Sequence, residues 1–515
     1  MNRLSLHLVC AFVLTIFVFV CAPAQEAPLA GFDAYVEKAL KDWEIPGVAI
    51  AVVKDNKLVF AKGYGVKEIG KPEKVDEKTI FGVASNSKAF TAAAIALLVD
   101  EGKLNWDDKV TKYLPEYQLF DLFVTREITI RDLLTHRNGL PAYGGDILWW
   151  GGDYSRDEII RRVRFVPPAS SFRTRFAYQN IPFITAGKIV ERVSGKTWEE
   201  FVKEHFFDAL GMQNTTTSIK TFNAQTNKTT PHFRDLETGK TISIQWRNLD
   251  NGAPAAGINS NVIDMAKWVR MQLNDGKFGD KQIVSERNMQ QCHAPQMPLP
   301  FSNPKDQPRL KTNFRAYGMG WYVREYAGER MISHGGWTDG QLTQVAMLPD
   351  KKLGVVVLTN IHNRDVYTPL VYRLFDAYLG LEPIDWSAYY LKRTRDFEKQ
   401  AVDEIRQKEA ARVKNPAPVL PLAAYAGTYE NELYGKISFA VENGKFVARL
   451  AHSPTFVGDV EPWQFNTFRV IWRDPVAEKT FLTFKVNAQG KVSSVKMAMT
   501  GFIDDGEYEY QKIDE

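Results

Sequence analysis

The segment Asn415-Pro416-Ala417-Pro418 divides the chain into two parts that differ in sequence pattern. The stretch before it, Tyr389 to Lys414, is rich in Lys, Arg, Glu and Asp at helical spacing, which predicts a charged helical linker over residues 389–417. Residues 418–515 contain short β-type runs separated by turn signals such as Glu442-Asn443-Gly444. This alternation predicts a small antiparallel sheet or barrel of about a hundred residues. The runs are Ile437 to Val441, Lys445 to Leu450, Thr467 to Trp472 and Thr480 to Val486.

The part before the linker, residues 29–388, mixes strand and helix patterns, which is typical of an α/β domain. Two β-type runs flank Asp55-Asn56 and predict a hairpin. Asn86 to Glu101 is rich in Ala and Leu and is followed by Gly102, so a helix is expected there. Other elements are expected over Val48 to Val53, Leu58 to Tyr64 and Leu353 to Thr359 (strands), Ile181 to Val193 and Thr197 to Leu210 (helices), and Pro295 to Arg309 (irregular loop).

The composition is that of a globular protein of enzyme size. The 515 residues are 44% hydrophobic and 12% aromatic, which suffices for one large core and a smaller one. The formal net charge is only +4, and no basic stripe or acidic block is present. We therefore expect no nucleic-acid partner.

The N-terminus has the pattern of a secretory signal peptide over residues 1–24. Arg3 precedes the apolar run Leu4 to Val20, and Ala22-Pro23-Ala24 provides small residues for cleavage after Ala24. We expect a secreted or periplasmic protein with no stable membrane insertion after cleavage. The alternative is an uncleaved membrane anchor, because the run is only slightly shorter than a bilayer span.

The cysteines and histidines do not form a recognisable metal or disulfide pattern. Cys10 and Cys21 lie within or beside the leader, which leaves Cys292 as the only cysteine of a mature chain. No histidine pairs with Cys, Asp or Glu at zinc-ligand spacing, and no Gly-rich phosphate loop is found. The sequence therefore implies no metal and no cofactor.

Ser85-Asn86-Ser87-Lys88 is the strongest candidate for catalytic chemistry. Three residues along a helix bring Lys88 almost one turn above Ser85, on the same face. A buried lysine with a lowered pKa can remove the proton of a serine hydroxyl, and a helix start favours the negative charge that develops during attack. The alternative is that Ser85 only caps the helix and Lys88 is a solvated helical residue.

Two other S-x-x-K segments show that this motif alone is weak evidence. Ser302 to Lys305 contains Pro304 in a loop, and Ser493 to Lys496 lies in a β segment whose Ser and Lys face opposite sides. Two downstream elements favour Ser85: Tyr178-Gln179-Asn180 before an apolar helix, and His334-Gly335-Gly336 after a short strand.

The ordered set of motifs resembles the class C β-lactamase, D-alanyl-D-alanine carboxypeptidase and esterase group, peptidase family S12. The resemblance covers roughly residues 29–379, and several motifs in one order are harder to obtain by chance than any one of them. It also includes Phe81-Gly82-Val83-Ala84, the segment from Leu133 to Pro141, and the segment from Ala255 to Ser260.

The resemblance implies a fold and a set of roles. The fold is a β-lactamase/transpeptidase-like antiparallel sheet flanked by helices, with a helical lobe, and the C-terminal part looks like a lipocalin-like β domain. Ser85 would be the nucleophile, Lys88 its proton partner, and Tyr178 the general base or acid. Backbone N–H groups of Ser85 and Trp337 would form the oxyanion hole. The substrate-binding residues would be Asn180, His334, Gly335 and Gly336, with Gly336 letting the substrate backbone approach the strand.

His334 departs from the lysine that many relatives carry at the same place. A lysine would be a fixed positive charge suited to a carboxylate, whereas a histidine is neutral part of the time near pH 7. We therefore expect a serine hydrolase that forms an acyl-enzyme and cleaves small esters, amides or short peptides of the D-amino-acid type. The alternative is a β-lactamase, or a penicillin-binding receptor that acylates with little turnover.

Three further expectations follow from the sequence. In the motif around His136 we expect that residue to hydrogen-bond a turn rather than to take part in chemistry. Trp149 and Trp150, in the segment from Tyr143 to Ser155, indicate an aromatic rim for a site that takes a small-molecule or short-peptide substrate. Because every candidate residue precedes the linker, a chain ending near Lys414 should fold, and the C-terminal domain is left free to cap the site or to form a homo-oligomer.

Overall fold

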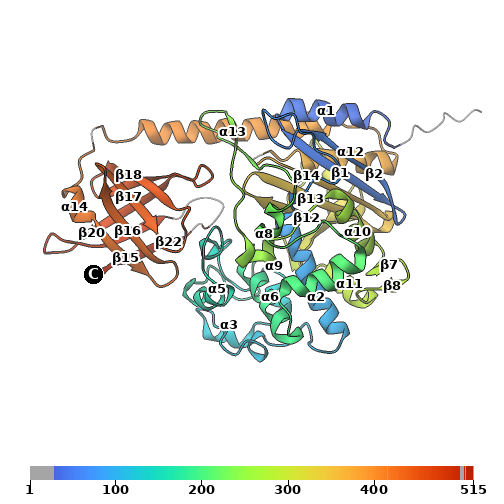
Figure 1. Cartoon of the computed structure of the whole chain (residues 1–515), viewed down its shortest axis with the longest axis horizontal. Coiled ribbons are helices and arrows are strands. Elements are labelled where there is room, and N and C mark those ends of the chain that lie inside the picture. The colour runs from blue at the N-terminus through green and yellow to red at the C-terminus, as the bar shows by residue number, and fades with distance from the viewer. Residues whose placement is uncertain (1–27, 363, 415, 499–503, 505, 514–515) are drawn as a thin grey trace, which may run out of the picture.

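The computed structural model describes residues 28–362, 364–414, 416–498, 504 and 506–513. The α/β fold class predicted from the sequence is confirmed: an antiparallel sheet with helices on both faces and a helical lobe is followed by an all-β domain (Figure 1). The expected signal peptide, residues 1–24, lies outside the described residues. In the described part of the chain, no helix has the length and apolar character needed to span a membrane.

The main sheet has eight antiparallel strands in the order β2-β1-β14-β13-β12-β11-β10-β9. The hairpin expected at Asp55-Asn56 joins β1 to β2, and both turn residues have a positive φ, 49° and 61°. The bounds are β1 Gly47–Lys54, β2 Lys57–Gly65, β9 Met297–Pro298, β10 Arg315–Tyr317, β11 Tyr322–Tyr326, β12 Glu329–Thr338, β13 Gln341–Leu348 and β14 Leu353–Thr359. Strand β9 lies within the segment expected to be an irregular loop, where it pairs with β10.

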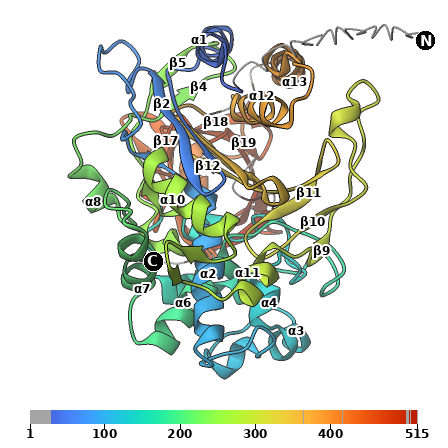
Figure 2. The ribbon, with the colours of Figure 1, turned by 90° about the vertical axis from the view of Figure 1, so that its right-hand side faces the viewer.

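The two faces of the sheet bury different cores. In β1, Val48, Ile50 and Val52 pack in a core with α1 (Phe32–Trp43), α12 (Tyr367–Leu379) and the start of α13. The alternate residues Ala49, Ala51 and Val53 belong to the core that contains α2 (Ser87–Asp100) and α10 (Val262–Leu273). Figure 2 shows α1, α12 and α13 on one side of the sheet and α2, α10 and α11 on the other.

Helix α2 runs through the centre of the α/β domain. Almost every residue from Ser87 to Leu98 is buried, as expected for a helix that is apolar on all sides. It packs against α6 (Ile181–Ser194), α9 (Ala253–Ala256) and α11 (Glu286–His293). The helix expected over residues 197–210 begins with a Thr197–Glu200 capping box as α7 (Trp198–Val202) and continues as a π-helix, Lys203–Asp208.

The remaining short elements of this domain are α3 Leu122–Glu127, α4 Ile130–Leu133, α5 Arg156–Arg162, α8 Ile219–Asn223, β3 Phe81–Gly82, β4 His232–Arg234, β5 Thr241–Ser243, β6 Asn259–Ser260, β7 Lys277–Phe278 and β8 Lys281–Gln282. Strands β3 and β6 pair beside the start of α2.

The C-terminal strands form a closed barrel of eight antiparallel strands, β15 to β22. They are β15 Gly427–Asn431, β16 Gly435–Glu442, β17 Lys445–Leu450, β18 Val457–Gln464, β19 Thr467–Trp472, β20 Thr480–Val486, β21 Val492–Ala498 and β22 Glu507–Ile513, preceded by α14 Leu422–Tyr425. Tyr429 of β15 is fully buried against Phe439 and Phe484, because its side chain points into the barrel.

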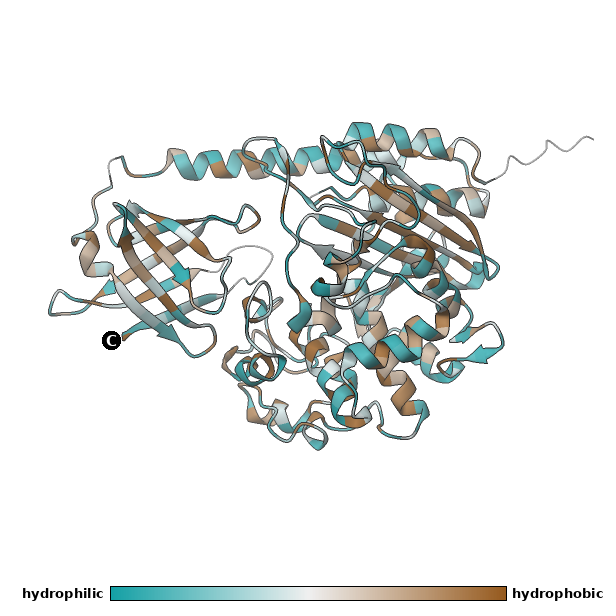
Figure 3. Ribbon diagram, viewed as in Figure 1, coloured by the Kyte–Doolittle hydropathy of each residue, from teal (hydrophilic) through white to brown (hydrophobic). Residues whose placement is uncertain are grey.

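Helix α13 (Trp386–Ala410) connects the α/β domain to the barrel. Its 25 residues span about 37 Å, and only Trp386, Ser387 and Leu391 are buried. Figure 3 shows that most residues along the rest of the helix are hydrophilic. At the far end, Glu409 pairs with Arg469 of the barrel.

Candidate active site

Ser85 lies in a tight turn, Ala84–Asn86, between β3 and α2. The Asn86 side-chain amide donates to the Val83 carbonyl at 3.1 Å and to Thr343 Oγ1 at 3.0 Å, which ties the turn to β13. Ala84 has φ 48°, a left-handed conformation that is uncommon for a residue with a Cβ. The turn presents Ser85 at the pocket while its neighbours are buried.

Lys88 is fully buried next to Ser85. Its Nζ lies 3.1 Å from Ser85 Oγ, 2.6 Å from Asn180 Oδ1 and 3.0 Å from the Ala255 carbonyl. Burial disfavours the ammonium and lowers the pKa of Lys88 to about 7, although the charge of Asp146 acts in the opposite direction. A substantial fraction of Lys88 is therefore neutral near pH 7.

Tyr178 completes the contacts of the serine. Its ring centre lies 4.8 Å from Lys88 Nζ, and its hydroxyl hydrogen-bonds Ser85. Burial raises the pKa of Tyr178 well above its usual value, and the hydrogen bond with Ser85 offsets this only in part. The phenol is therefore protonated at neutral pH.

Asp146 is a buried acid at this site that the sequence did not single out. Asn180 bridges it to Lys88: Asn180 Oδ1 accepts from Lys88, and Asn180 Nδ2 donates to Asp146 Oδ2. Trp149 Nε1 donates to Asp146 Oδ1 at 2.9 Å. Burial raises the pKa of Asp146 to about 7. No motif marks this residue, and the only signal is an acid directly before the apolar run Ile147 to Trp150.

His334 lies on β12 and faces the same pocket. Its Nδ1 donates to the carbonyl of Gly335 at 2.6 Å, which leaves Nε2 to accept from the Tyr317 hydroxyl at 3.0 Å. Burial lowers the pKa of His334 to about 3, and nearby Lys88 adds to the effect. The expectation that His334 is protonated part of the time near pH 7 is therefore wrong: the ring is neutral.

Gly336 lies where β12 crosses the turn Ala84–Asn86, which carries Ser85. A Cβ at this position would come within 2.2 Å of the Val83 carbonyl and of Thr343 Oγ1. This packing alone requires a glycine at 336, a reason different from the substrate approach expected from the sequence. At Gly335 the nearest atom to a Cβ would be the Gln344 amide oxygen at 3.2 Å, and the other neighbours lie at ordinary contact distance.

His136 holds the segment that carries Tyr178. Its carbonyl accepts from the Ala177 N–H at 2.9 Å, and its Nδ1 accepts from the Gln179 N–H at 3.1 Å. Its ring centre lies 4.4 Å from that of Tyr178. Burial lowers the pKa of His136 well below its usual value. His136 thus bonds backbone groups, as the sequence indicated, and these groups flank Tyr178.

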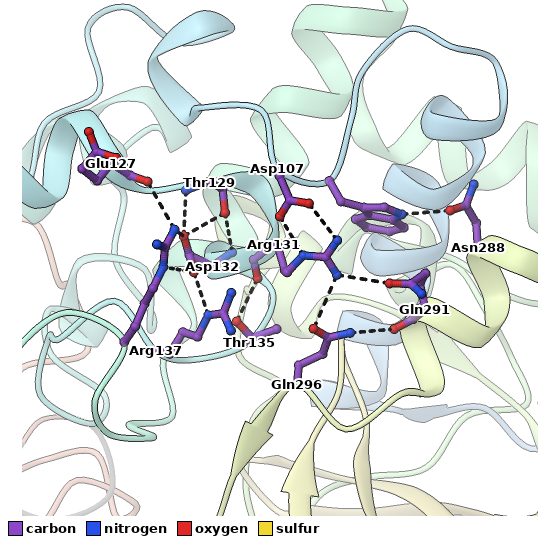
Figure 4. Close-up of polar contacts among 12 residues, drawn as sticks. Asp107, Glu127, Thr129, Arg131, Asp132, Thr135, Arg137, Asn288, Gln291 and Gln296 are labelled. Carbon is purple, nitrogen blue, oxygen red and sulfur yellow. Dashed lines mark hydrogen bonds and ion pairs between the residues drawn. The ribbon is translucent and has the colours of Figure 1, made fainter.

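The loop that carries His136 is anchored by charged side chains (Figure 4). The side chain of Asp132 is completely buried. It forms ion pairs with Arg137 (Nε to Oδ1, 2.7 Å) and with Arg173 (Nη2 to Oδ2, 2.6 Å). Its neighbour Arg131 pairs with Asp107 at 2.8 Å and reaches Gln291 of α11 at 3.3 Å. These contacts tie α4 to the surrounding elements and keep His136 beside Tyr178.

The candidate residues surround one pocket of about 400 Å³. Ser85, Tyr178, Asn180, His334, Gly335, Gly336 and Trp337 all line it, and Lys88 lies directly behind Ser85. Tyr143, Trp149 and Trp150 also line it, as expected for an aromatic rim. The structure thus brings together every residue that the sequence singled out for catalysis or binding.

The barrel packs against the back of this rim. Arg247 stacks on Trp150 at 3.6 Å and pairs with Asp339 of the α/β domain and, at 2.6 Å, with Asp474 of the barrel. Asp504, a buried barrel residue, accepts from the Gly145 N–H at 3.1 Å, directly before Asp146. The barrel therefore supports the wall of the pocket.

The other residues considered from the sequence lie elsewhere. Cys292 is buried in α11, where burial raises its pKa to about 12. Ser302 lies in an exposed loop and Ser493 on the outside of the barrel strand β21. Among the described residues, no three of His, Cys, Asp or Glu come together as a metal site.

Comparisons with known proteins agree with this architecture. Residues 32–376 match the beta-lactamase family, and residues 411–514 match a domain of unknown function (DUF3471). The octameric penicillin-binding protein homologue from Pyrococcus abyssi superposes with a TM-score of 0.61 at 22% identity, covering 94% of this chain and all of the other.

Several relatives share the sequence over most of its length. Unguisins hydrolase ungD' of Aspergillus campestris is 31% identical over 431 residues, which cover 79% of this chain and 77% of the relative. Unguisins hydrolase ungD of Aspergillus violaceofuscus is 28% identical over 455 residues, 82% and 78% of the two chains. Protein flp of Staphylococcus aureus is 26% identical over 339 residues, 65% and 63% of the two chains.

Proposed function

The chain belongs to the beta-lactamase family and is a hydrolase of that fold, and from this we propose that it cleaves small esters, amides or short D-amino-acid-type peptides through an acyl-enzyme on Ser85. The observation that carries the proposal is the contact of Lys88 Nζ with Ser85 Oγ at 3.1 Å, with Lys88 buried and its pKa lowered to about 7. A neutral amine in this position can accept the serine proton.

The proposed reaction proceeds in two halves. Neutral Lys88 takes the proton of Ser85 as Oγ attacks the carbonyl carbon, and the N–H groups of Ser85 and Trp337 stabilise the oxyanion. The proton passes through Tyr178 to the leaving group as the carbon–oxygen or carbon–nitrogen bond breaks. Water then attacks the carbonyl carbon of the acyl-enzyme, and its proton passes through the same groups to Ser85 Oγ as the bond from Oγ to the acyl group breaks and the acid leaves. Because Tyr178 is protonated at neutral pH, it acts as a donor and Lys88 as the first acceptor.

Asn180 and His334 have supporting roles in this proposal. Asn180 keeps Lys88 in place and, through its remaining amide hydrogen, holds the substrate amide. Neutral His334 places no fixed charge beside the acyl group, which favours neutral esters and amides there over β-lactams. Relatives named unguisins hydrolase support turnover over a receptor that acylates and stalls.

We further propose that the chain is of the peptidase family S12 type and that the barrel is a lipocalin-like domain. We also propose that the mature protein is exported after cleavage behind Ala24 and that it forms a homo-oligomer. N-terminal sequencing of secreted protein tests the cleavage. An intact Met1 in a membrane fraction would favour an anchor instead.

A substrate panel tests the activity. Purified protein and Ser85→Ala are compared on p-nitrophenyl esters, D-amino-acid amides and a chromogenic cephalosporin. We expect the wild type to hydrolyse esters or D-amino-acid amides with a higher kcat/KM than the cephalosporin, and Ser85→Ala to lose all three activities. A cephalosporin hydrolysed as fast as any ester would support the β-lactamase alternative. Acylation by penicillin without turnover of any substrate would support the receptor.

A further inference from the structure

Two buried aspartates, Asp146 of the α/β domain and Asp504 of the barrel, form no ion pair with any described lysine, arginine or histidine. The other aspartates buried in the described part of the chain each contact a lysine or an arginine, and they are Asp132, Asp264, Asp339 and Asp376. A buried carboxylate without a cation costs stability. Two such groups at one place therefore favour a role in function over a role in folding.

Asp504 is held as a hydrogen-bond acceptor on both of its oxygens. Its Oδ2 accepts from the Gly145 N–H at 3.1 Å and from the Tyr508 hydroxyl at 2.9 Å, and its Oδ1 accepts from the Gly506 N–H at 2.8 Å. The Tyr434 hydroxyl donates to Oδ2 as well. Because a backbone N–H can only donate, these contacts stabilise the carboxylate over the acid. Burial raises the pKa of Asp504, and the hydrogen bonds act in the opposite direction.

The contact with Gly145 brings Asp504 to the turn directly before Asp146. Gly145 has φ 86° and caps the short helix that begins at Asp146. The Asp146 carboxylate accepts from Asn180, whose Oδ1 accepts from Lys88 Nζ at 2.6 Å. One path of contacts thus leads from the barrel to the proposed base.

The two carboxylates disfavour each other's charge. Burial is the main cause of the raised pKa of Asp146, and the charge of Asp504 adds to it. An ionised Asp146 in turn favours the ammonium form of Lys88. The groups that lower the pKa of Asp146 are Trp149, Asn180 and Lys88. The titratable rings beside these groups are neutral at pH 7, and they are Tyr178, Tyr434, Tyr508, Tyr510, His136 and His334.

We propose that Asp504 is a positioning residue of the active site: its carboxylate holds the turn before Asp146 and opposes the ionisation of Asp146, which keeps Lys88 available as a neutral base. The proposal rests on the proposed function, in which Lys88 accepts the serine proton. The barrel then contributes to the electrostatics of the pocket as well as to the packing of its wall.

Asp504→Asn tests the role of the charge, because the amide has nearly the same size as the carboxylate. Without the charge of Asp504, Asp146 should ionise at a lower pH and stabilise the Lys88 ammonium. The acid limb is the pH range in which kcat/KM falls as the pH falls. For p-nitrophenyl acetate we expect this limb to move up by about half a pH unit or more. A residue with only a structural role would lower Tm or kcat without moving the limb.

A double variant shows whether the effect passes through Asp146. Asp146→Asn alone should move the acid limb to lower pH, because it removes the charge that favours the ammonium of Lys88. Adding Asp504→Asn to Asp146→Asn should then cause no further shift, whereas the effects of two independent groups would add.

Tyr508→Phe is a second variant, and it keeps the carboxylate. It removes one donor to Asp504 and so weakens the ionised form, and the acid limb should move in the same direction as in Asp504→Asn, by less. Tyr510→Phe is the matched control. Tyr510 lies on the same strand, β22, and its buried hydroxyl has no hydrogen-bond partner among the described residues, so this variant should keep the wild-type limb.

The results separate the positioning role from the proposed function. An acid limb that stays in place or moves to lower pH in folded Asp504→Asn overturns the role of Asp504 alone, and so does an equal shift with and without Asp146→Asn. If Asp504→Asn does not fold, an unmoved limb in Tyr508→Phe has the same meaning. Turnover that persists in Ser85→Ala overturns the proposed function as well.

Discussion

At the scale of single residues, the protonation of Lys88 decides in the proposed mechanism at which pH Ser85 can be activated. Because the pKa of Lys88 is lowered to about 7, the neutral base is present above that pH and is lost as the pH falls. We expect kcat/KM for a neutral ester to rise about tenfold per unit below pH 7 and then to level off. Lys88→Arg, which stays charged, should be inactive throughout. A flat profile between about pH 5 and pH 9 would contradict Lys88 as the base.

Asp146 should affect the pH at which kcat/KM falls. Its charge raises the pKa of Lys88, so Asp146→Asn should lower that pKa further and move the acid limb to lower pH. The Asn variant retains a carbonyl oxygen that can accept from Asn180. The pH profile of kcat/KM measures the shift, and a limb that moves to higher pH would show that Asp146 does not act through Lys88.

His136 should affect catalysis through the position of Tyr178. His136→Ala removes the acceptor for the Gln179 N–H, so kcat should fall about tenfold or more. His136→Asn should restore part of the activity, because its amide oxygen can occupy the place of Nδ1. His293→Ala is the control: this buried histidine bonds Gln272, and its loss should lower Tm with little effect on kcat. If His136→Ala, His136→Asn and His293→Ala lost kcat equally, the effect would be a general loss of stability, and His136 would not position Tyr178.

The residues that could be predicted from the sequence are those in motifs. Ser85, Lys88, Tyr178 and His334 belong to recognisable patterns, and the structure places them together. Asp146 could not be found in this way, because its importance comes from burial beside Asn180, which depends on the folding of a distant loop. The neutrality of His334 was missed for the same reason, since it results from desolvation and from the proximity of Lys88.

At the scale of elements, β12 crosses the turn that carries Ser85 so closely that a side chain at Gly336 would clash with it. Gly336→Ala would place a methyl group 2.2 Å from the Val83 carbonyl, so the turn must shift and Ser85 must move away from Lys88. We expect this variant to lose acylation almost completely. Gly335→Ala, which meets only a flexible amide, should lose much less. The rate of acylation by a fluorophosphonate measures both, and equal rates would show that the turn is not held by this contact.

Elements with strong local signals could be predicted from the sequence. Strand β14 and helix α6 begin at the expected residues, and the hairpin at Asp55-Asn56 is present because its turn residues accept a positive φ. Short edge strands such as β9 could not be predicted, because their pairing partner is remote in sequence and Pro298 weakens the pattern. The inward orientation of Tyr429 could not be predicted because barrel closure decides which face is inside.

At the scale of the whole molecule, the barrel is part of the support of the pocket. Trp150 of the rim packs against Phe456 of the barrel and Arg247 pairs with Asp474, so a chain ending near Lys414 would lose a neighbour of Trp150 and one of the two carboxylates that contact Arg247. These contacts favour the opposite of the expectation that such a chain folds. We expect the truncated chain to aggregate or to unfold at a lower temperature, measured by size-exclusion chromatography and thermal unfolding. A monomeric truncated chain with the wild-type Tm and kcat would show that the barrel is dispensable.

A single substitution tests the interface between the barrel and the pocket rim without removing the barrel. Asp474→Asn removes one carboxylate from the buried Arg247, which should cost roughly 1–3 kcal/mol of unfolding free energy. The control Arg473→Gln breaks a pair with Asp459 that is largely exposed, and should cost less than about 1 kcal/mol. Equal effects in denaturant unfolding would indicate that the Arg247 pair does not hold the barrel in place.

The identity of the nucleophile is the centre of the proposed function. Treatment of the intact protein with a fluorophosphonate, followed by digestion and mass spectrometry, locates the modified residue directly. We predict one modification, on the peptide that contains Ser85, faster above pH 7 than below it and absent in Ser85→Ala. Modification of Ser302, Ser493 or any other serine in its place, or labelling that survives in Ser85→Ala, would contradict the assignment of Ser85 as the nucleophile.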